Sequence, residues 1–298
     1  MTENARGILA MLIGSTAFVM NDAMVKLVTA ELPAGEIIVI RGVLSTALLA
    51  IGVAAMRAMR PIAVLLTPMM LVRLAAAAGA TIFVVLTLRH LPLATVNCVV
   101  QFTPLAVTAG AALVWGERVG WRRWLAALAG FLGVVLIVKP GGSFGVAAYL
   151  ALTTLMFTTI RDLSTRGLPR DIPSIFVAAA SAVVITLGGL LVVPVDAAWS
   201  MPSSRAWAYL CVSAACLFVA NTFLIVAFRT GEIAVVAPFR YVPVPLSILL
   251  GWWWWDDLPD ALAFLGIGLV LAAGLYMLHR ERPSLAPRMP APQRRAAQ

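Results

Sequence analysis

Polar side chains recur at helical spacing within apolar stretches of this sequence. Asn97, Gln101, Pro104 and Thr108 are separated by four, three and four residues, which places them along one face of a helix. Their polar groups could line the path of a ligand, and Phe102 between them could receive its apolar part. The alternative is that they bond to neighbouring helices, which contributes only about 0.6 kcal/mol for each bond in a membrane.

A second polar group comprises Arg240 and Tyr241, close to Pro243 and Pro245. A guanidinium binds a carboxylate through two parallel hydrogen bonds, and a tyrosine ring stacks on a ligand or hydrogen-bonds it. We therefore predict a substrate site here, with Arg240 extended to the lipid headgroups as the alternative. Because proline lacks an N–H and frees a backbone carbonyl, Pro104, Pro243 and Pro245 are predicted hinges.

Charged residues also lie at matching depth in the first two apolar stretches. At 1.5 Å per residue, Asp22 and Arg41 are each expected about 10 Å from the same end of their helices. A buried ion pair is therefore predicted, with Lys26 and Glu36 close enough to extend it. We interpret the pair as structural or as an outer gate. The alternatives are that Asp22 takes up a proton or that these residues contact substrate.

The four-three-four spacing recurs in a further stripe, formed by Thr154, Thr158, Arg161 and Thr165. We expect this stripe to line an inner gate or entrance. The alternative is that these are ordinary polar residues near the end of a helix. Asp162 adjoins the stripe and is grouped with the gate. Thr81 and Asn221 are additional candidates for the wall of a cavity. All these side chains need elements that hold polar groups away from lipid, since a central Arg or Asp costs about 2.5–3.5 kcal/mol there.

The composition identifies those elements as membrane-spanning helices. Of 298 residues, 62% are hydrophobic and 12% charged, with a mean hydropathy of +0.97, whereas soluble domains have about 45–50% and about 25%. About 20 apolar residues cross a bilayer. The fold predicted is an all-α integral membrane protein with ten spans, at residues 7–28, 34–56, 69–88, 92–114, 121–138, 146–165, 173–194, 206–227, 233–253 and 259–278.

The net charge of +9 is explained by topology. If the N-terminus is cytoplasmic, most Lys and Arg fall in cytoplasmic loops, as the positive-inside rule requires. We therefore expect a multi-pass membrane protein with both termini in the cytoplasm. Its expected partners are the lipid bilayer and a small-molecule substrate. Nucleic acid is not needed to explain the charge, and the sequence allows a monomer or a homo-oligomer.

The sequence contains neither the HExxH motif of metalloproteases nor the GxxxxGK(S/T) motif of P-loop proteins. The three cysteines form no CxxC pair, and neither histidine lies in mid-span, so we expect no metal and no cofactor. An intramembrane protease would need a mid-span histidine or two facing aspartates, and only Asp22 lies well inside a span. We therefore predict that the chain is not an enzyme. A channel is the other alternative, and uncoupled conductance would indicate it.

The two halves of the sequence match weakly when one is shifted by 140 residues. Asp22-x3-Lys26 meets Asp162-x3-Arg166, Thr81 meets Asn221, and Ala126 and Gly133 meet Gly266 and Ala273. Five spans in each half force the second half to enter the membrane inverted, an arrangement typical of secondary transporters. We predict a first repeat at 1–139, a second at 140–278 and a disordered cytoplasmic tail at 279–298.

Residues 88–138 resemble the first EamA domain of the drug/metabolite transporter superfamily. The resemblance rests on Leu91-Pro92-Leu93-Ala94, Pro104 in mid-span and Gly116-Glu117-Arg118, and it is weaker in the second half, where Trp255-Asp256-Asp257 replaces Gly-Glu. It implies an exporter of small metabolites in the bacterial inner membrane, most similar to bacterial exporters of amino acids, including aromatic ones. Alternating access around a central cavity is expected. The alternative is a carrier of nucleotide-sugars or other phosphorylated metabolites.

Overall fold

The computed structural model describes residues 2–117, 119–139, 145–169, 171–194, 199–230 and 232–281. Every regular element within these ranges is a helix, and nine stretches there are long and apolar enough to cross a membrane. The predicted all-α, multi-span fold is therefore confirmed. The remaining predicted span, 233–253, is broken into shorter helices. The tail predicted from residue 279 begins later, because helix α12 continues to Glu281; residues 282–298 lie outside the described residues.

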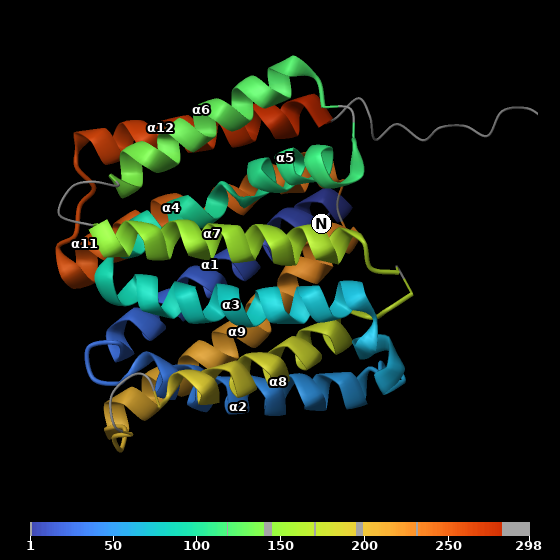
Figure 1. The fold of residues 1–298 in the computed structure, drawn as a ribbon, viewed down its shortest axis with the longest axis vertical. Helices are drawn as coiled ribbons and strands as arrows, with labels where there is room; N and C mark the ends of the chain where they lie inside the picture. Colours follow the sequence, from blue (N-terminus) through green and yellow to red (C-terminus); the bar gives the residue numbers. More distant parts are fainter. Residues whose placement is uncertain are drawn as a thin grey trace, which may run out of the picture.

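The described residues of the first half form six α-helices and one 3₁₀-helix: α1 (Glu3–Val28), α2 (Ala34–Ala55), η1 (Ile62–Leu66), α3 (Pro68–His90), α4 (Leu93–Gln101), α5 (Thr103–Trp115) and α6 (Trp121–Val138). The second half contains α7 (Gly145–Arg166), α8 (Ser174–Val192), α9 (Ser204–Thr230), α10 (Ile233–Val236), η2 (Ala237–Tyr241), α11 (Pro243–Trp255) and α12 (Ala261–Glu281). We call the end of the bundle where α1 begins and α12 ends the terminal end, and the opposite end the distal end (Figure 1).

Among the spans that the structure describes, two are broken along their length, one in each half. Pro104 cannot donate to the carbonyl of Val100, and the Thr103 hydroxyl donates to that oxygen instead, at 2.5 Å. This bond satisfies the carbonyl that the break between α4 and α5 exposes. In the second half, Pro243 begins α11 after the 3₁₀ turn of η2. Pro104 and Pro243 thus lie at the breaks and Pro245 lies in the first turn of α11, while the role of all three as hinges stays a prediction.

The helices of the two halves begin at positions related by the 140-residue shift. The paired first residues are Ala34 and Ser174, Leu93 and Ile233, Thr103 and Pro243, and Trp121 and Ala261. The left-handed residues that end α5 and α11, Gly116 and Asp256, are related by the same shift. Paired helices such as α1 and α7 run in opposite directions through the bundle (Figure 1).

Helix packing follows the same approximate two-fold relation. Helix α1 packs along α9 and α3 along α7, so each pair joins the two halves. Related helices also pair with each other: α2 with α8, α6 with α12, and α4 with α11. The α6–α12 and α2–α8 pairs lie at opposite ends of the long axis (Figure 1). The broken spans therefore lie in the interior between them.

Small residues allow the α6–α12 pair to approach closely. A Cβ atom at Gly133 would lie 2.6 Å from the carbonyl oxygen of Gly266, and one at Gly266 would lie 2.5 Å from the carbonyl oxygen of Gly133. The small residues noted in the sequence thus face the other half of the same chain. Close backbone approach of this kind is a common basis of helix association in lipid.

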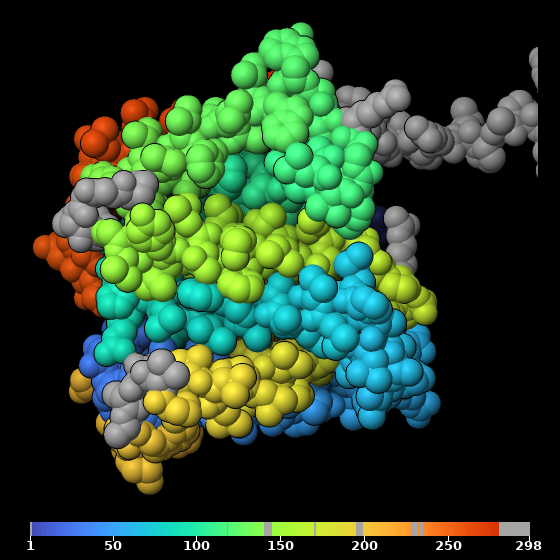
Figure 2. Space-filling model, viewed as in Figure 1, coloured from blue at the N-terminus to red at the C-terminus, as the bar shows by residue number. Residues whose placement is uncertain are grey.

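Apolar side chains divide between the bundle interior and its outer surface. Ile37, Leu88 and Leu105, from three different spans, are fully buried in the main core. Others, such as Leu191 and Leu125, are exposed on the outside, which suits a surface facing lipid tails. In the space-filling view, α7, α3 and α8 form one continuous face of this surface (Figure 2).

Candidate substrate site

A cavity of about 290 Å³ lies between the two halves, towards the terminal end. Its wall comes from α5, α7, η2 and α12, so both halves contribute to it. The polar residues of the wall are Thr108, Asp162, Arg166, Arg240 and Tyr241. The apolar part includes Leu105, Val107 and Met277. Apolar walls with a few convergent polar groups are typical of small-molecule sites.

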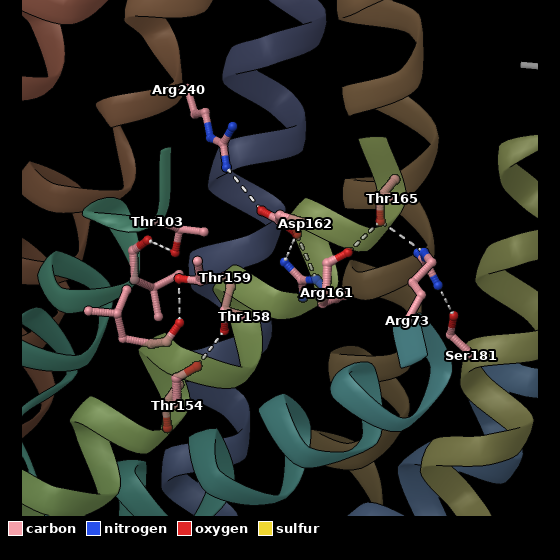
Figure 3. Close-up of polar contacts among 12 residues, drawn as sticks. Arg73, Thr103, Thr154, Thr158, Thr159, Arg161, Asp162, Thr165, Ser181 and Arg240 are labelled. Atoms are coloured by element: carbon pink, nitrogen blue, oxygen red, sulfur yellow. Dashed lines mark hydrogen bonds and ion pairs between the residues drawn. The ribbon is translucent and has the colours of Figure 1, made fainter. Parts of the chain in front are cut away.

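The charged groups of the cavity centre on Asp162. Its Oδ1 accepts a hydrogen bond from Nε of Arg161 at 2.8 Å, and its Oδ2 lies 4.0 Å from Nη2 of Arg240 (Figure 3). The first distance is that of a charge-assisted hydrogen bond, whereas the second exceeds hydrogen-bonding range. The guanidinium of Arg240 therefore retains donors for a ligand, and its side chain is 41% exposed.

Tyr241 and Gly274 shape the opposite wall. A Cβ atom at Gly274 would collide with the Tyr241 hydroxyl and lie 2.5 Å from Cζ of the ring. The absence of a side chain on α12 therefore provides the space that the tyrosine occupies. Thr108 lines the cavity as well, and its hydroxyl donates to the carbonyl of Pro104 at 3.0 Å.

Gln101 connects the two broken spans. Its Nε2 donates to the backbone carbonyl of Arg240 at 2.6 Å, across the two halves. Gln101 was predicted to bind substrate, but its amide nitrogen is engaged by η2. This bond fixes the backbone that carries Arg240 and Tyr241. The sequence does not reveal it, because the acceptor is a backbone atom.

Arg73 extends the polar network around the cavity, and sequence reasoning missed it. From α3, its Nε donates to the Thr165 hydroxyl at 3.0 Å and its Nη1 donates to the Ser181 hydroxyl at 2.6 Å (Figure 3). The Thr165 hydroxyl in turn donates to the carbonyl of Arg161. The signal that could have identified Arg73 is its position in the repeat, where it lies 140 residues before Ser213.

A second polar cluster lies towards the distal end and corrects the predicted contact between Asp22 and Arg41. Among the residues that the structure describes, these two form no direct ion pair. Asn21 stands between them: its Nδ2 donates to Asp22 Oδ1 at 2.9 Å, and its Oδ1 accepts from Arg41 Nη1 at 3.4 Å. The Ser213 hydroxyl donates to the same Oδ1 at 2.8 Å. Asn97 faces the Asp22 carboxylate from α4.

Lys26 and Glu36 do not extend this cluster as expected. Lys26 Nζ donates to the carbonyls of Leu91 at 2.7 Å and Leu88 at 3.4 Å, which lie at the end of α3. Glu36 Oε2 accepts from the backbone N–H of Ser200 at 3.1 Å. Both therefore tie distal ends of helices to neighbouring segments, because free carbonyls and N–H groups at helix ends are better partners than distant charges.

A further contact at the distal end joins the two halves outside the spans. Lys139 pairs with Asp260, which precedes α12 and also accepts from the N–H of Ala263 at 2.9 Å. The hydrogen bond from Lys139 is the largest cause of the lowered pKa of the Asp260 carboxyl. The distal ends of α6 and α12 are thus held together.

The other predicted cavity residues lie outside the cavity wall. Asn97 donates to the carbonyl of Leu93 in its own helix, and Asn221 does the same with Leu217. The Phe102 ring is buried against α6, where a Cβ atom at Gly130 would lie 2.8 Å from it. Thr81 is half-buried on α3. Their proposed contacts with substrate stay predictions.

In the part of the chain that the structure describes, no group of three His, Cys, Asp or Glu side chains could hold a metal ion. The cavity wall instead carries one carboxylate and two guanidinium groups, which can bind charged parts of a ligand but supply no nucleophile activated by a base. The fold and site define a multi-span membrane protein with a ligand cavity between two halves.

Comparisons with known proteins place the chain in a family. Residues 5–139 match the model of the EamA-like transporter family. The pseudopaline exporter CntI of Pseudomonas aeruginosa strain UCBPP-PA14 is 30% identical over 282 residues, which cover 90% of this chain and 94% of that protein. The riboflavin transporter of Rhizobium johnstonii is 29% identical over 196 residues, covering 65% of this chain and 64% of the relative.

A solved crystal structure shares the fold, with a TM-score of 0.64 and 20% sequence identity over 91% of this chain and 98% of that one. The chain belongs to the EamA-like transporter family. The resemblance noted in the sequence is thereby confirmed, and the relatives are small-molecule transporters rather than enzymes.

Proposed function

We propose that the protein exports small organic metabolites bearing a carboxylate, amino acids above all, by alternating access. The observation that carries the proposal is the cavity in which Asp162 faces Arg240, with Arg166 nearby. A zwitterion complements this arrangement: its ammonium group pairs with Asp162 and its carboxylate with Arg240. The apolar wall, including Leu105 and Met277, then receives the side chain of the substrate.

The size of the cavity supports a small substrate. At about 290 Å³ it lies at the lower limit of ligand pockets, which range over about 300–1,000 Å³. The second candidate is a carrier of nucleotide-sugars or other phosphorylated metabolites, favoured by the two guanidinium groups of Arg166 and Arg240. Asp162 opposes it, because a carboxylate repels a phosphate at close range.

The arrangement of the two ends supports alternating access. The cavity lies towards the terminal end, whereas the distal end is tied by Lys26, Glu36 and the Lys139–Asp260 pair. With both termini in the cytoplasm of a bacterial cell, as the positive-inside rule predicts, the cavity faces the cytoplasm and can load a metabolite for export. The name of the pseudopaline exporter supports the same direction.

Transport into proteoliposomes tests the proposal. The panel contains labelled phenylalanine, phenethylamine (the same molecule without its carboxylate), riboflavin and a nucleotide-sugar, each with and without a pH gradient. We expect saturable uptake of phenylalanine. Because a hydrogen bond to a charged group contributes about 1.5–3 kcal/mol, Arg240→Gln should lower it about 10- to 150-fold, and phenethylamine uptake much less.

Arg205→Gln is the matched control, because Arg205 is exposed at the start of α9 and does not line the cavity. If Arg240→Gln lowered the uptake of phenylalanine and of phenethylamine equally, this would contradict the role of Arg240. Uptake of the nucleotide-sugar alone would replace the first candidate by the second. Uptake that is insensitive to the pH gradient would indicate a facilitator, and accumulation driven by the gradient would indicate proton coupling.

A further inference from the structure

The two polar clusters of the bundle are built from corresponding positions. The distal quartet is defined by Asn21, Asp22, Arg41 and Ser213, and the terminal quartet by Arg161, Asp162, Ser181 and Arg73. Every member of one quartet lies 140 residues from a member of the other, which is the shift that relates the helix starts of the two halves.

Two of the corresponding positions have their arginine and serine exchanged between the quartets. The aspartates match directly, Asp22 with Asp162, and both lie on the helix that opens their half, α1 or α7. Arg41 on α2 matches Ser181 on α8, whereas Ser213 on α9 matches Arg73 on α3. Each quartet therefore has one aspartate, a serine on one neighbouring helix and an arginine on the other, with the last two interchanged between the ends. Beside the aspartate, Arg161 takes the position of Asn21.

Each quartet also bridges the two halves. In the distal quartet the Ser213 hydroxyl reaches Asn21 from the second half at 2.8 Å. In the terminal quartet Arg73 reaches Ser181 from the first half at 2.6 Å. Because three helices from both halves meet in each cluster, movement of one half against the other must change both clusters.

Burial distinguishes the two quartets. All four distal residues are buried: Asn21 is 2% exposed, Asp22 and Arg41 6% each, and Ser213 0%. The terminal aspartate lines the cavity, and its side chain is 28% exposed. Charged groups away from water require hydrogen-bonding partners around them, and the distal quartet supplies these, whereas the terminal one leaves Asp162 open to the cavity.

We propose that the two quartets are the two gates of the transport cycle, built on one plan and closed in alternation. This inference rests on the proposed function. In the state described, the distal quartet encloses its aspartate, whereas in the terminal quartet Arg73 bonds Ser181 but Asp162 stays open to the cavity. In the opposite state the terminal quartet closes around Asp162, and Asp22 with Arg41 faces the substrate on the distal side, offering a zwitterion the same pair of charges.

The interchange of arginine and serine provides a specific test. Arg41→Ser leaves Asp22 without its cation, and Ser213→Arg alone places two cations on one carboxylate. The double variant Arg41→Ser/Ser213→Arg restores one arginine and one serine on the two neighbouring helices, α9 and α2, in the arrangement that Arg73 and Ser181 have in the terminal quartet. We expect each single variant to lower phenylalanine uptake at least about tenfold, and the double variant to recover most of it. Arg205→Ser is the control for loss of an arginine outside the gates.

Labelling of reporter cysteines tests the gates without any substrate. Val107 on α5 lines the cavity and matches Ser247 on α11, which is 0% exposed. In a chain lacking Cys98, Cys211 and Cys216, each position is replaced by cysteine in turn and exposed to an impermeant maleimide. We expect Val107→Cys to react from the terminal side and Ser247→Cys to be protected from the distal side.

Arg41→Ser should reverse this pattern, and the double variant should restore it. Increased labelling at both reporters, or no recovery in a double variant that elutes as a monodisperse protein, would overturn the paired gates. Labelling requires no substrate. If amino acids are not the substrate, no amino-acid uptake will be seen, but the labelling pattern will still be the one expected. The two failures are therefore distinguishable.

Discussion

Helices α6 and α12 cross where backbone meets backbone, and this contact predicts the effect of a single methyl group. A Cβ atom at Gly266 would lie 2.5 Å from the carbonyl oxygen of Gly133, about 0.9 Å closer than the 3.4 Å of ordinary contact. Since the atom it meets belongs to the backbone, no side-chain rotation relieves the overlap, and the helices must separate. Overpacking of this kind costs about 1–3 kcal/mol.

Gly268→Ala is the matched control, because a Cβ atom there would meet nothing within 4 Å. Both substitutions gain helix propensity, about 1 kcal/mol in water, and only Gly266→Ala incurs the overlap. We therefore expect Gly266→Ala to be less stable than Gly268→Ala by about 1–3 kcal/mol. The free energy of unfolding is measured by titration with a denaturing detergent in mixed micelles, followed by tryptophan fluorescence.

The reciprocal variant provides an independent check. A Cβ atom at Gly133 would lie 2.6 Å from the carbonyl oxygen of Gly266, so Gly133→Ala should lose a similar amount. If both variants were as stable as Gly268→Ala, the two backbones could not be in contact in the protein. The packing of the two halves along α6 and α12 would then have to be reconsidered.

Two further substitutions test individual bonds. Thr103→Val removes the hydroxyl that satisfies the Val100 carbonyl and should cost about 1–3 kcal/mol; Thr103→Ser should retain most of the stability, and equal losses would contradict the role of the hydroxyl. Asp260→Asn removes a carboxyl whose pKa is lowered in the folded state. The stability it contributes is present above the ordinary pKa and lost as pH falls through the lowered one, so wild type and variant should converge in acid. A difference that is constant from neutral to acid pH would refute this.

The sequence by itself determined the membrane fold and predicted a division into two related halves. Composition and the length of apolar stretches require helices, because backbone groups in lipid must be satisfied within their own segment. The 140-residue shift located matching residues, and Pro104 and Pro243 marked the broken spans. These features depend on periodicity and local chemistry, which a single sequence records.

Only the tertiary structure decided which side chains meet. The sequence placed Asp22 and Arg41 at equal depth, but depth does not give the direction of a side chain around its helix, and Asn21 takes the position between them. It offered Gln101 to a substrate, whereas the chain supplies a backbone carbonyl as the partner. Contacts between segments far apart depend on how helices rotate and cross, and that is fixed by packing of the whole bundle rather than by the pattern of any one span.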